Sequence, residues 1–250
     1  MALDDVKSWA QVSRVLPSTV QDNVSAPVRV SRYGEYIVQT LTGNKLHGLA
    51  DEGKYFVATN PTPGTGVDGH AAPSDITVDT KPHVFIRNDA SASTDSRLYL
   101  DFIRLQVTAA GAGATTALWC AKMDTGATRY SSGGTEITEV NANMASTASS
   151  SAKIYHGAVV AAAATTSQRI LGSGLLRTVV PVVGDTYLFT FGQPAPSVSS
   201  MIVGSTAIAN IVVPMPPVVL GPADQFLLHL AGASQSGAHS YEITLGFWER

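Results

Sequence analysis

The chain has 250 residues, only 14% of them charged, and a formal net charge of −3. Soluble domains average about 25% charged residues, so this surface is expected to consist mainly of small neutral side chains, which suits close contact between proteins. A nucleic-acid partner is excluded, because holding phosphates requires a basic stripe and the sequence has none. The length allows one large domain, or a domain with an extension.

Export and membrane insertion are not expected. Residues 1–5 include two aspartates where a signal peptide is basic, and no apolar stretch follows them. The most apolar region, residues 201–220, is interrupted by a glycine, an asparagine and three prolines, so it does not read as a membrane-spanning helix. Cys120 is the one cysteine and lies in an apolar run, which excludes an intrachain disulfide and fits synthesis in a reducing cytosol.

Residues 1–80 are predicted to form an extended N-terminal arm with little core of its own. Apolar residues at helical spacing predict a short helix over residues 3–16. Residues 28–38 and 55–59 are typical of strands. Prolines and glycines at 60–66 exclude regular structure there.

From residue 81 to 250 the pattern changes to short strands separated by turns. Strands are expected near residues 84–86, 97–108, 115–123, 135–140, 153–160, 170–183, 185–191, 226–230 and 241–247. The apolar alternation slips by one residue between Phe102 and Ile103, which predicts a β-bulge or a crossing between sheets. The fold class expected is all-β, a β-sandwich of jelly-roll or Greek-key type.

The histidines form no metal-binding pattern. They stand at His47, His70, His83, His156, His229 and His239, with neither an HxH nor an HExxH spacing. Each is expected to be a surface histidine or a structural one, so we predict no metal and no cofactor.

Motifs for catalysis are weak. Residues 150–153 satisfy SxxK, but they lie in a low-complexity loop that leads into a strand rather than at the start of a helix. Glu136 and Glu139 are three residues apart, which places them on opposite faces of a strand. The tryptophans are far apart in the sequence, at Trp9, Trp119 and Trp248. We predict no catalytic residues and no enzyme, and we keep a carbohydrate-binding or hydrolytic β-sandwich as an alternative.

Two segments resemble virion structural proteins of tailed bacteriophages. They are residues 50–66, ADEGKYFVATNPTPGTG, and residues 240–250, SYEITLGFWER. The Ala/Thr/Ser-rich strands between them are compatible with the same family. The resemblance implies a capsid decoration or cement protein with a jelly-roll-like sandwich. It also implies a homotrimer that binds the major capsid protein on the capsid surface of the virion. The chain would then be synthesised in the cytoplasm of the host bacterium.

A tail, baseplate or fibre-base component is the alternative within the virion, although the sequence shows neither repeats nor the heptads usual in fibres. Aromatic side chains of the predicted arm have no local core to cover them, so they are expected to bind the partner surface. These residues are Trp9, Tyr33, Tyr36, Tyr55 and Phe56.

Overall fold

The computed structural model describes residues 45–60, 62–71, 79–94, 96–126, 128–164, 168–193 and 208–250. Internal contacts divide the chain between Gly48 and Leu49, and the part from Leu49 onward holds both sheets. The helix expected at 3–16 and the strand expected at 28–38 lie outside the described residues. Helix α1 (Lys45–Asp51) precedes the first strand. Among the described residues, no helix combines the length and apolarity needed to cross a membrane.

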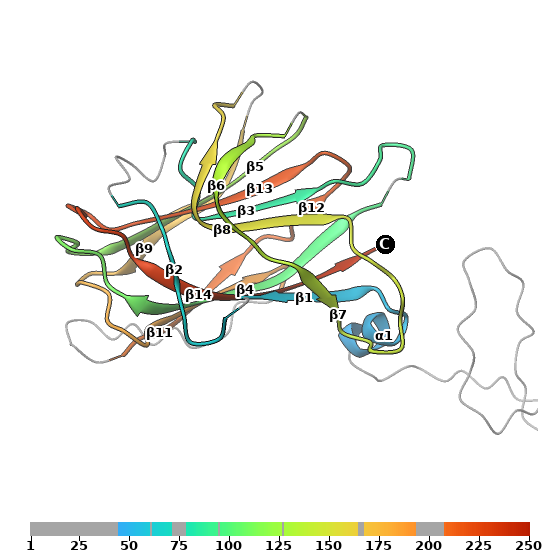
Figure 1. Cartoon of the computed structure of the whole chain (residues 1–250), viewed down its shortest axis with the longest axis horizontal. Coiled ribbons are helices and arrows are strands. Elements are labelled where there is room, and N and C mark those ends of the chain that lie inside the picture. Colours follow the sequence, from blue (N-terminus) through green and yellow to red (C-terminus); the bar gives the residue numbers. More distant parts are fainter. Residues whose placement is uncertain are drawn as a thin grey trace, which may run out of the picture. The chain divides into compact units, whose positions relative to one another are not determined.

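Two β-sheets follow α1 (Figure 1). The strands of the first sheet are β1 (Tyr55–Thr59), β2 (Val67–Asp68), β4 (Leu98–Ala109), β7 (Glu139–Asn141), β10 (Thr186–Phe191), β11 (Asn210–Met215), β12 (Val219–Leu220) and β14 (Ser240–Glu249). The strands of the second sheet are β3 (Val84–Asn88), β5 (Ala117–Asp124), β6 (Tyr130–Glu136), β8 (Ala152–Ala161), β9 (Arg169–Arg177) and β13 (Gln225–Ala231).

The first sheet has the order β11-β10-β4-β14-β1-β7, with β12 beside β4 and β2 beside β14. The second has the order β6-β8-β3-β13-β5-β9. Strands β10 and β11 run parallel, and the other pairs in the described chain are antiparallel. The prediction of an all-β sandwich is confirmed.

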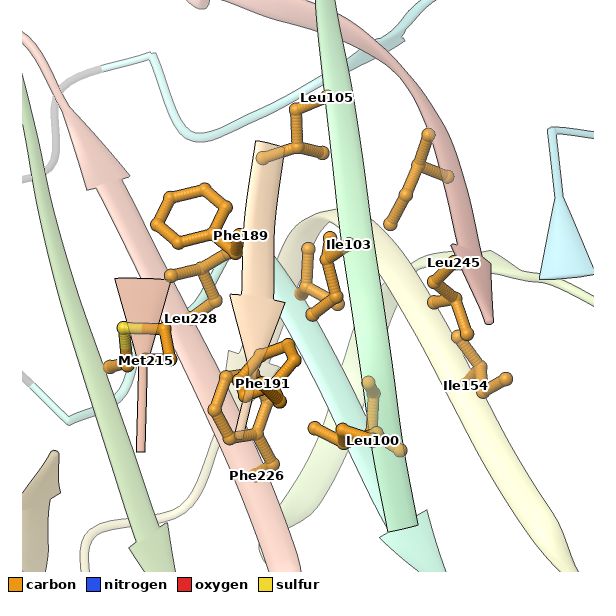
Figure 2. Close-up of a cluster of buried hydrophobic side chains, with 14 of the residues drawn as sticks. Leu100, Ile103, Leu105, Ile154, Phe189, Phe191, Met215, Phe226, Leu228 and Leu245 are labelled. Carbon is orange, nitrogen blue, oxygen red and sulfur yellow. The ribbon is translucent and has the colours of Figure 1, made fainter. Parts of the chain in front are cut away.

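One apolar core lies between the sheets (Figure 2). Alternate residues of a strand point to one face, and Tyr187, Phe189 and Phe191 of β10 are at most 5% exposed. From the second sheet, Phe226 of β13 meets Phe191 edge to face, with ring centroids 5.5 Å apart. Each large apolar side chain buried in this way contributes about 1.5–3 kcal/mol. The contact between the two inner faces therefore holds the sheets together.

A β-bulge shifts the apolar phase of β4 at Asp101. Leu100 pairs with Phe247 and Phe102 pairs with Gly246, so Asp101 has no residue opposite it. The residues that face the core are odd-numbered after the bulge and even-numbered before it. The predicted slip is confirmed, but it begins earlier than expected, because Phe102 lies outside the core and is half-buried.

The sandwich also begins earlier in the sequence than the boundary expected near residue 80. All of β1 pairs with β14, from Tyr55 opposite Trp248 to Thr59 opposite Thr244. Phe56 stacks on the ring of Phe247, 5.7 Å away. Residues 55–59 therefore belong to the first sheet. A local sequence pattern cannot reveal that two strands so far apart in the sequence pair with each other.

The Gly133–Gly134 pair lies inside β6. Both residues have positive φ, about the left-handed value that glycine adopts most readily. The pairing of β6 with β8 shifts register between Gly133 and Thr135. The two glycines thus form a bulge in an edge strand rather than a chain reversal.

A buried ion pair fixes the loop between β9 and β10. Arg177 Nη1 donates to Asp185 Oδ1, and the two side chains are 5% and 0% exposed. The same carboxylate accepts the backbone N–H groups of Val182 at 2.8 Å and Ala209 at 2.7 Å. These donors compensate the desolvation of a buried charge, which is costly when it is unpaired. Asp185 therefore joins the ends of β9, β10 and β11.

Removal of this carboxylate is expected to destabilise the sandwich strongly. Asp185→Ala should lower the free energy of unfolding by about 3–5 kcal/mol, because it removes the carboxylate that neutralises the buried guanidinium. Urea denaturation measures the change. The matched control is Glu136→Ala, which breaks the exposed ion pair with Lys153 and should cost less than about 1 kcal/mol. Equal losses in the two variants would contradict the structural role of Asp185.

Candidate functional site

The serine and lysine of the SxxK pattern are each held by a different carboxylate. Ser150 Oγ donates to Glu249 Oε1 at 2.5 Å. Lys153 Nζ donates to Glu136 Oε1 at 3.2 Å. Ser150 precedes β8 and Lys153 lies within it, not on a helix. Both side chains thus have structural contacts that join strands.

Metal-ligand groups do not converge in the described ranges, where no three His, Cys, Asp or Glu side chains form a metal site. Three histidines do lie together, at one end of the core: His83 before β3, His156 in β8 and His239 before β14. The rings of His83 and His156 meet edge to face at 4.7 Å, and His83 packs on Tyr241 at 4.8 Å. All three histidines are at most 3% exposed, so they belong to the interior.

Backbone groups orient two of these rings. His156 Nε2 lies 2.9 Å from the carbonyl oxygen of Tyr241, so this nitrogen carries the proton. Gly111 N–H donates to His239 Nδ1 at 2.8 Å, so that nitrogen is the acceptor. Burial lowers the pKa of His156 to about 4 and also lowers the pKa of His239. Burial, followed by the neighbouring histidines, holds the pKa of His83 well below its ordinary value.

A network of buried charges lies on the outer side of the second sheet. Arg129 Nη1 donates to Asp124 Oδ2 at 2.6 Å, and Lys122 Nζ donates to Asp79 Oδ1 at 2.6 Å. Gln225 accepts the backbone N–H of Arg129 at 2.7 Å and donates to Asp124 at 3.2 Å. The network joins β5 and β13 to the segment before β6, so its charges act as structural ties.

Four aromatic side chains gather on the outer face of the first sheet. Strand pairing places Tyr55, Trp248 and Tyr99 in a row across β1, β14 and β4. The rings of Trp248 and Tyr99 stack, with centroids 3.7 Å apart. Phe102 lies beside Gly246, where a Cβ atom would come within 2.5 Å of its ring and 2.4 Å of the Tyr55 hydroxyl. Glycine thus leaves the space that both rings occupy. We call Tyr55, Tyr99, Phe102 and Trp248 the aromatic row.

Asp101, the extra residue of the bulge, supplies the polar group of the aromatic row. The Tyr55 hydroxyl donates to Asp101 Oδ2 at 2.7 Å, and Gln193 Nε2 donates to Asp101 Oδ1 at 3.1 Å. Burial raises the pKa of Tyr55, and the hydrogen bond to this carboxylate raises it further, so the phenol stays a neutral donor. The arrangement joins stacked rings to a fixed carboxylate and a side-chain amide.

The aromatic residues expected to bind a partner have different locations. Tyr55 lies in the aromatic row and is 9% exposed, whereas Phe56 faces the core and is 3% exposed. Other parts of the sandwich cover both, so neither projects from an arm. Trp9, Tyr33 and Tyr36 lie outside the described residues. Tyr99, Phe102 and Asp101 were not singled out from the sequence, although the slipped alternation of β4 was a signal for the bulge that places them.

A set of exposed apolar side chains lies where the edge strands of the two sheets meet. β9 ends the second sheet, β11 ends the first, and the two strands contact each other. The exposed residues are Ile170 and Leu175 of β9, Val180 and Val183 of the following loop, and Ile208 before β11. Their exposed fractions run from 43% to 65%. We call these five residues the edge patch, and it has the composition of an interaction surface.

Comparison with known proteins assigns no relative. No family model, no curated protein and no solved structure matches the chain. The function of the edge patch and the aromatic row therefore has to be inferred from their own chemistry.

Acid is expected to destabilise the sandwich between pH 6.5 and about 4. In this range His156 is protonated in the unfolded chain but stays neutral in the folded chain, because burial lowers its pKa. The free energy of unfolding therefore falls as the pH decreases. For His156 alone the full loss is about 3 kcal/mol, reached near pH 4.

Urea denaturation at a series of pH values measures this loss. His156→Gln should reduce the dependence of the free energy of unfolding on pH. The glutamine amide can still donate to the Tyr241 carbonyl, but it does not titrate. A slope identical to that of the unmodified chain would contradict the interpretation.

Proposed function

We propose that this chain is a non-enzymatic virion structural protein that binds and stabilises the capsid surface of a tailed bacteriophage as a homo-oligomer. The major capsid protein and further copies of the chain are its proposed partners. The observation that carries the proposal is the strand order, because it supports a sandwich type that capsid proteins use. The edge patch and the resemblance of two segments add independent support.

Eight strands support the jelly-roll type. They divide into the sets β1-β14-β4-β10 and β3-β13-β5-β9, each consecutive within one sheet. In chain order, the first strand of the eight pairs with the last, and the second pairs with the last but one. Two nested Greek keys have this order, and viral capsid domains are among the proteins built in this way. The remaining strands extend or flank the two sets.

The edge patch supports a role in assembly. Apolar side chains that gather on an exposed surface can mark a region that becomes buried in a complex. The edge patch has five exposed apolar side chains. The low fraction of charged residues in the chain, 14%, also suits close contact between proteins. The step from assembly to the phage capsid depends on the resemblance of residues 50–66 and 240–250 to virion structural proteins. A place in the tail or baseplate is the alternative that the same observations allow.

Particles made without the chain are expected to have weaker capsids. The test deletes its coding sequence from the phage genome that carries it and measures DNA release from purified heads on heating. Heads without the chain should release DNA at a lower temperature, because a cement protein adds contacts between capsid subunits. Supplying the chain in trans should restore the original release temperature. Heads of unchanged thermal resistance would contradict the cement role. Antibody labelling confined to tails would favour the alternative.

Saccharide binding is the second candidate function, and the aromatic row favours it. Sugar rings pack on aromatic faces, while carboxylate and amide groups bind their hydroxyls, a combination typical of ligand sites. Asp101 and Gln193 lie beside the row and supply both polar groups. Among the described residues, Asp101 hydrogen-bonds to Tyr55 and Gln193 and not to a second carboxylate, and this arrangement suits binding better than hydrolysis.

A glycan array followed by calorimetry tests this second function. Binding of a glycan should fall at least tenfold in Tyr99→Ala, because the stacked pair loses one ring. Val140→Ala removes an exposed apolar side chain on β7 and should leave binding unchanged. The absence of binding to any glycan by the unmodified chain would eliminate the candidate.

A further inference from the structure

The sequence of β9 is symmetric about its central residue. From Arg169 to Arg177 it reads R-I-L-G-S-G-L-L-R. Gly172 and Gly174 are equidistant from Ser173, and the apolar pairs and the terminal arginines are placed in the same way on either side. An antiparallel pair of such strands, related by a two-fold axis through Ser173, brings like residues opposite one another.

The outer edge of β9 is suited to strand pairing. On its inner side Gly172–Leu175 pairs one to one with Ala121–Leu118 of β5. Register shifts flank this stretch, at Leu171 and Leu176. On its other side β9 pairs with no strand in the described part of the chain. Such an edge presents backbone N–H and C=O groups that can template another strand.

Other sheet edges carry features that discourage pairing. β6 contains the two positive-φ glycines, which bend it in the middle. β11 has Pro214, which lacks an N–H group, and β7 is only three residues long. β9 is therefore the edge strand of the described sandwich that combines length with a regular central stretch.

We infer that β9 pairs with β9 of a second copy, antiparallel and around a two-fold axis at Ser173, so that the second sheets of two chains become continuous. This inference rests on the proposed role in assembly and names the surface and the partner. In this register Ser173 faces its own counterpart. Leu171 is set outside the pairing by its register shift, so Leu175 lies opposite Ile170 of the other copy. Ile170 and Leu175 are on the outer face, since they pair with Lys122 and Leu118, so the exposed apolar residues cover one another across the seam.

The dimensions of the edge fit a stable contact. Nine residues at about 3.4 Å each span about 30 Å. Two sheets about 10 Å apart, with their side chains, give an edge about 20 Å wide. The contact then buries about 600 Å² on each copy, or about 1,200 Å² in total, the lower limit for specific dimers. Val180, Val183 and Ile208 lie along the same edge and supply further apolar area.

Charge does not oppose the contact. The pairing brings Arg169 of one copy toward Arg177 of the other. Arg177 is already paired with the buried carboxylate of Asp185, and only Arg169 is exposed. The approach thus joins one solvated cation to a neutralised one, which costs little at a solvated rim.

Sedimentation equilibrium of the full chain over a micromolar concentration series tests the inference. The unmodified chain should have the mass of a dimer. Ile170→Lys combined with Leu175→Lys should give a monomer, because four new charges meet at the seam. The matched control, Val140→Lys with Met144→Lys, changes two exposed apolar residues elsewhere and should remain dimeric. Circular dichroism verifies that both double variants are folded.

A cysteine at the two-fold axis provides a direct position test. Ser173→Cys should form a disulfide-linked dimer under mild oxidation, reversed by reductant, because opposite Cβ atoms in a strand pair are close enough for the bond. Cys120 lies opposite Ser173 in the β5–β9 pair, so both cysteine variants also carry Cys120→Ala, which excludes an intrachain disulfide. Ser132→Cys, on the exposed edge strand β6, is the control and should stay monomeric on a reducing-agent-free gel.

Three results would overturn the inference: a monomer at every concentration, a mass unaffected by the β9 variant, or cross-linking by Ser132→Cys but not by Ser173→Cys. A closed trimer, the oligomer that the resemblance implies, would also overturn it, because a two-fold contact cannot close a three-membered ring. A measurement of how the β9 double variant binds to phage heads distinguishes the dimer proposal from the proposed capsid role. A monomer that still binds refutes only the dimer, and a dimer that does not bind refutes only the capsid role.

Discussion

The antiparallel pairing of β4 with β14 runs through the middle of the first sheet, with β10 on one side and β1 on the other. Its register shifts at two points, where Asp101 and Thr108 have no residue opposite. The first bulge turns Asp101 toward Tyr55 and completes the aromatic row. At the other end the ladder positions Tyr241, whose ring and carbonyl contact His83 and His156. One ladder thus sets the core, the outer aromatic face and the histidine cluster.

Local patterns predicted most strands because half-buried strands alternate. A strand was expected near residues 185–191, and Tyr187, Phe189 and Phe191 of this strand all face the core. The slip in β4 was visible in the sequence because the bulge moves the core-facing apolar residues from even-numbered to odd-numbered positions. Contacts that depend on the tertiary structure left no such signal. Examples are the ion pair of Arg177 with Asp185, eight residues further on, and the pairing of residues 55–59 with the end of the chain. Helix α1 is seven residues long with a glycine inside, so it lacks the periodicity that predicts a helix.

The two candidate surfaces differ in chemistry, and this separates their proposed roles. The edge patch is apolar and includes two residues of the edge strand β9, which suits a protein partner that supplies both a strand and apolar area. The aromatic row has a carboxylate and an amide fixed beside stacked rings, which suits a small polar ligand with hydroxyl groups. Neither surface was predicted as such, because each is assembled from strands or loops separated in the sequence.

A cryo-electron microscopy map of the native particle tests the assembly role most directly. The proposal predicts two-sheet density on the outer capsid surface, in pairs that meet along the β9 edges. A particle whose capsid and tail both lack this density would contradict a virion role. Density present as isolated sandwiches, with β9 facing solvent, would keep the virion role and contradict the contact between copies.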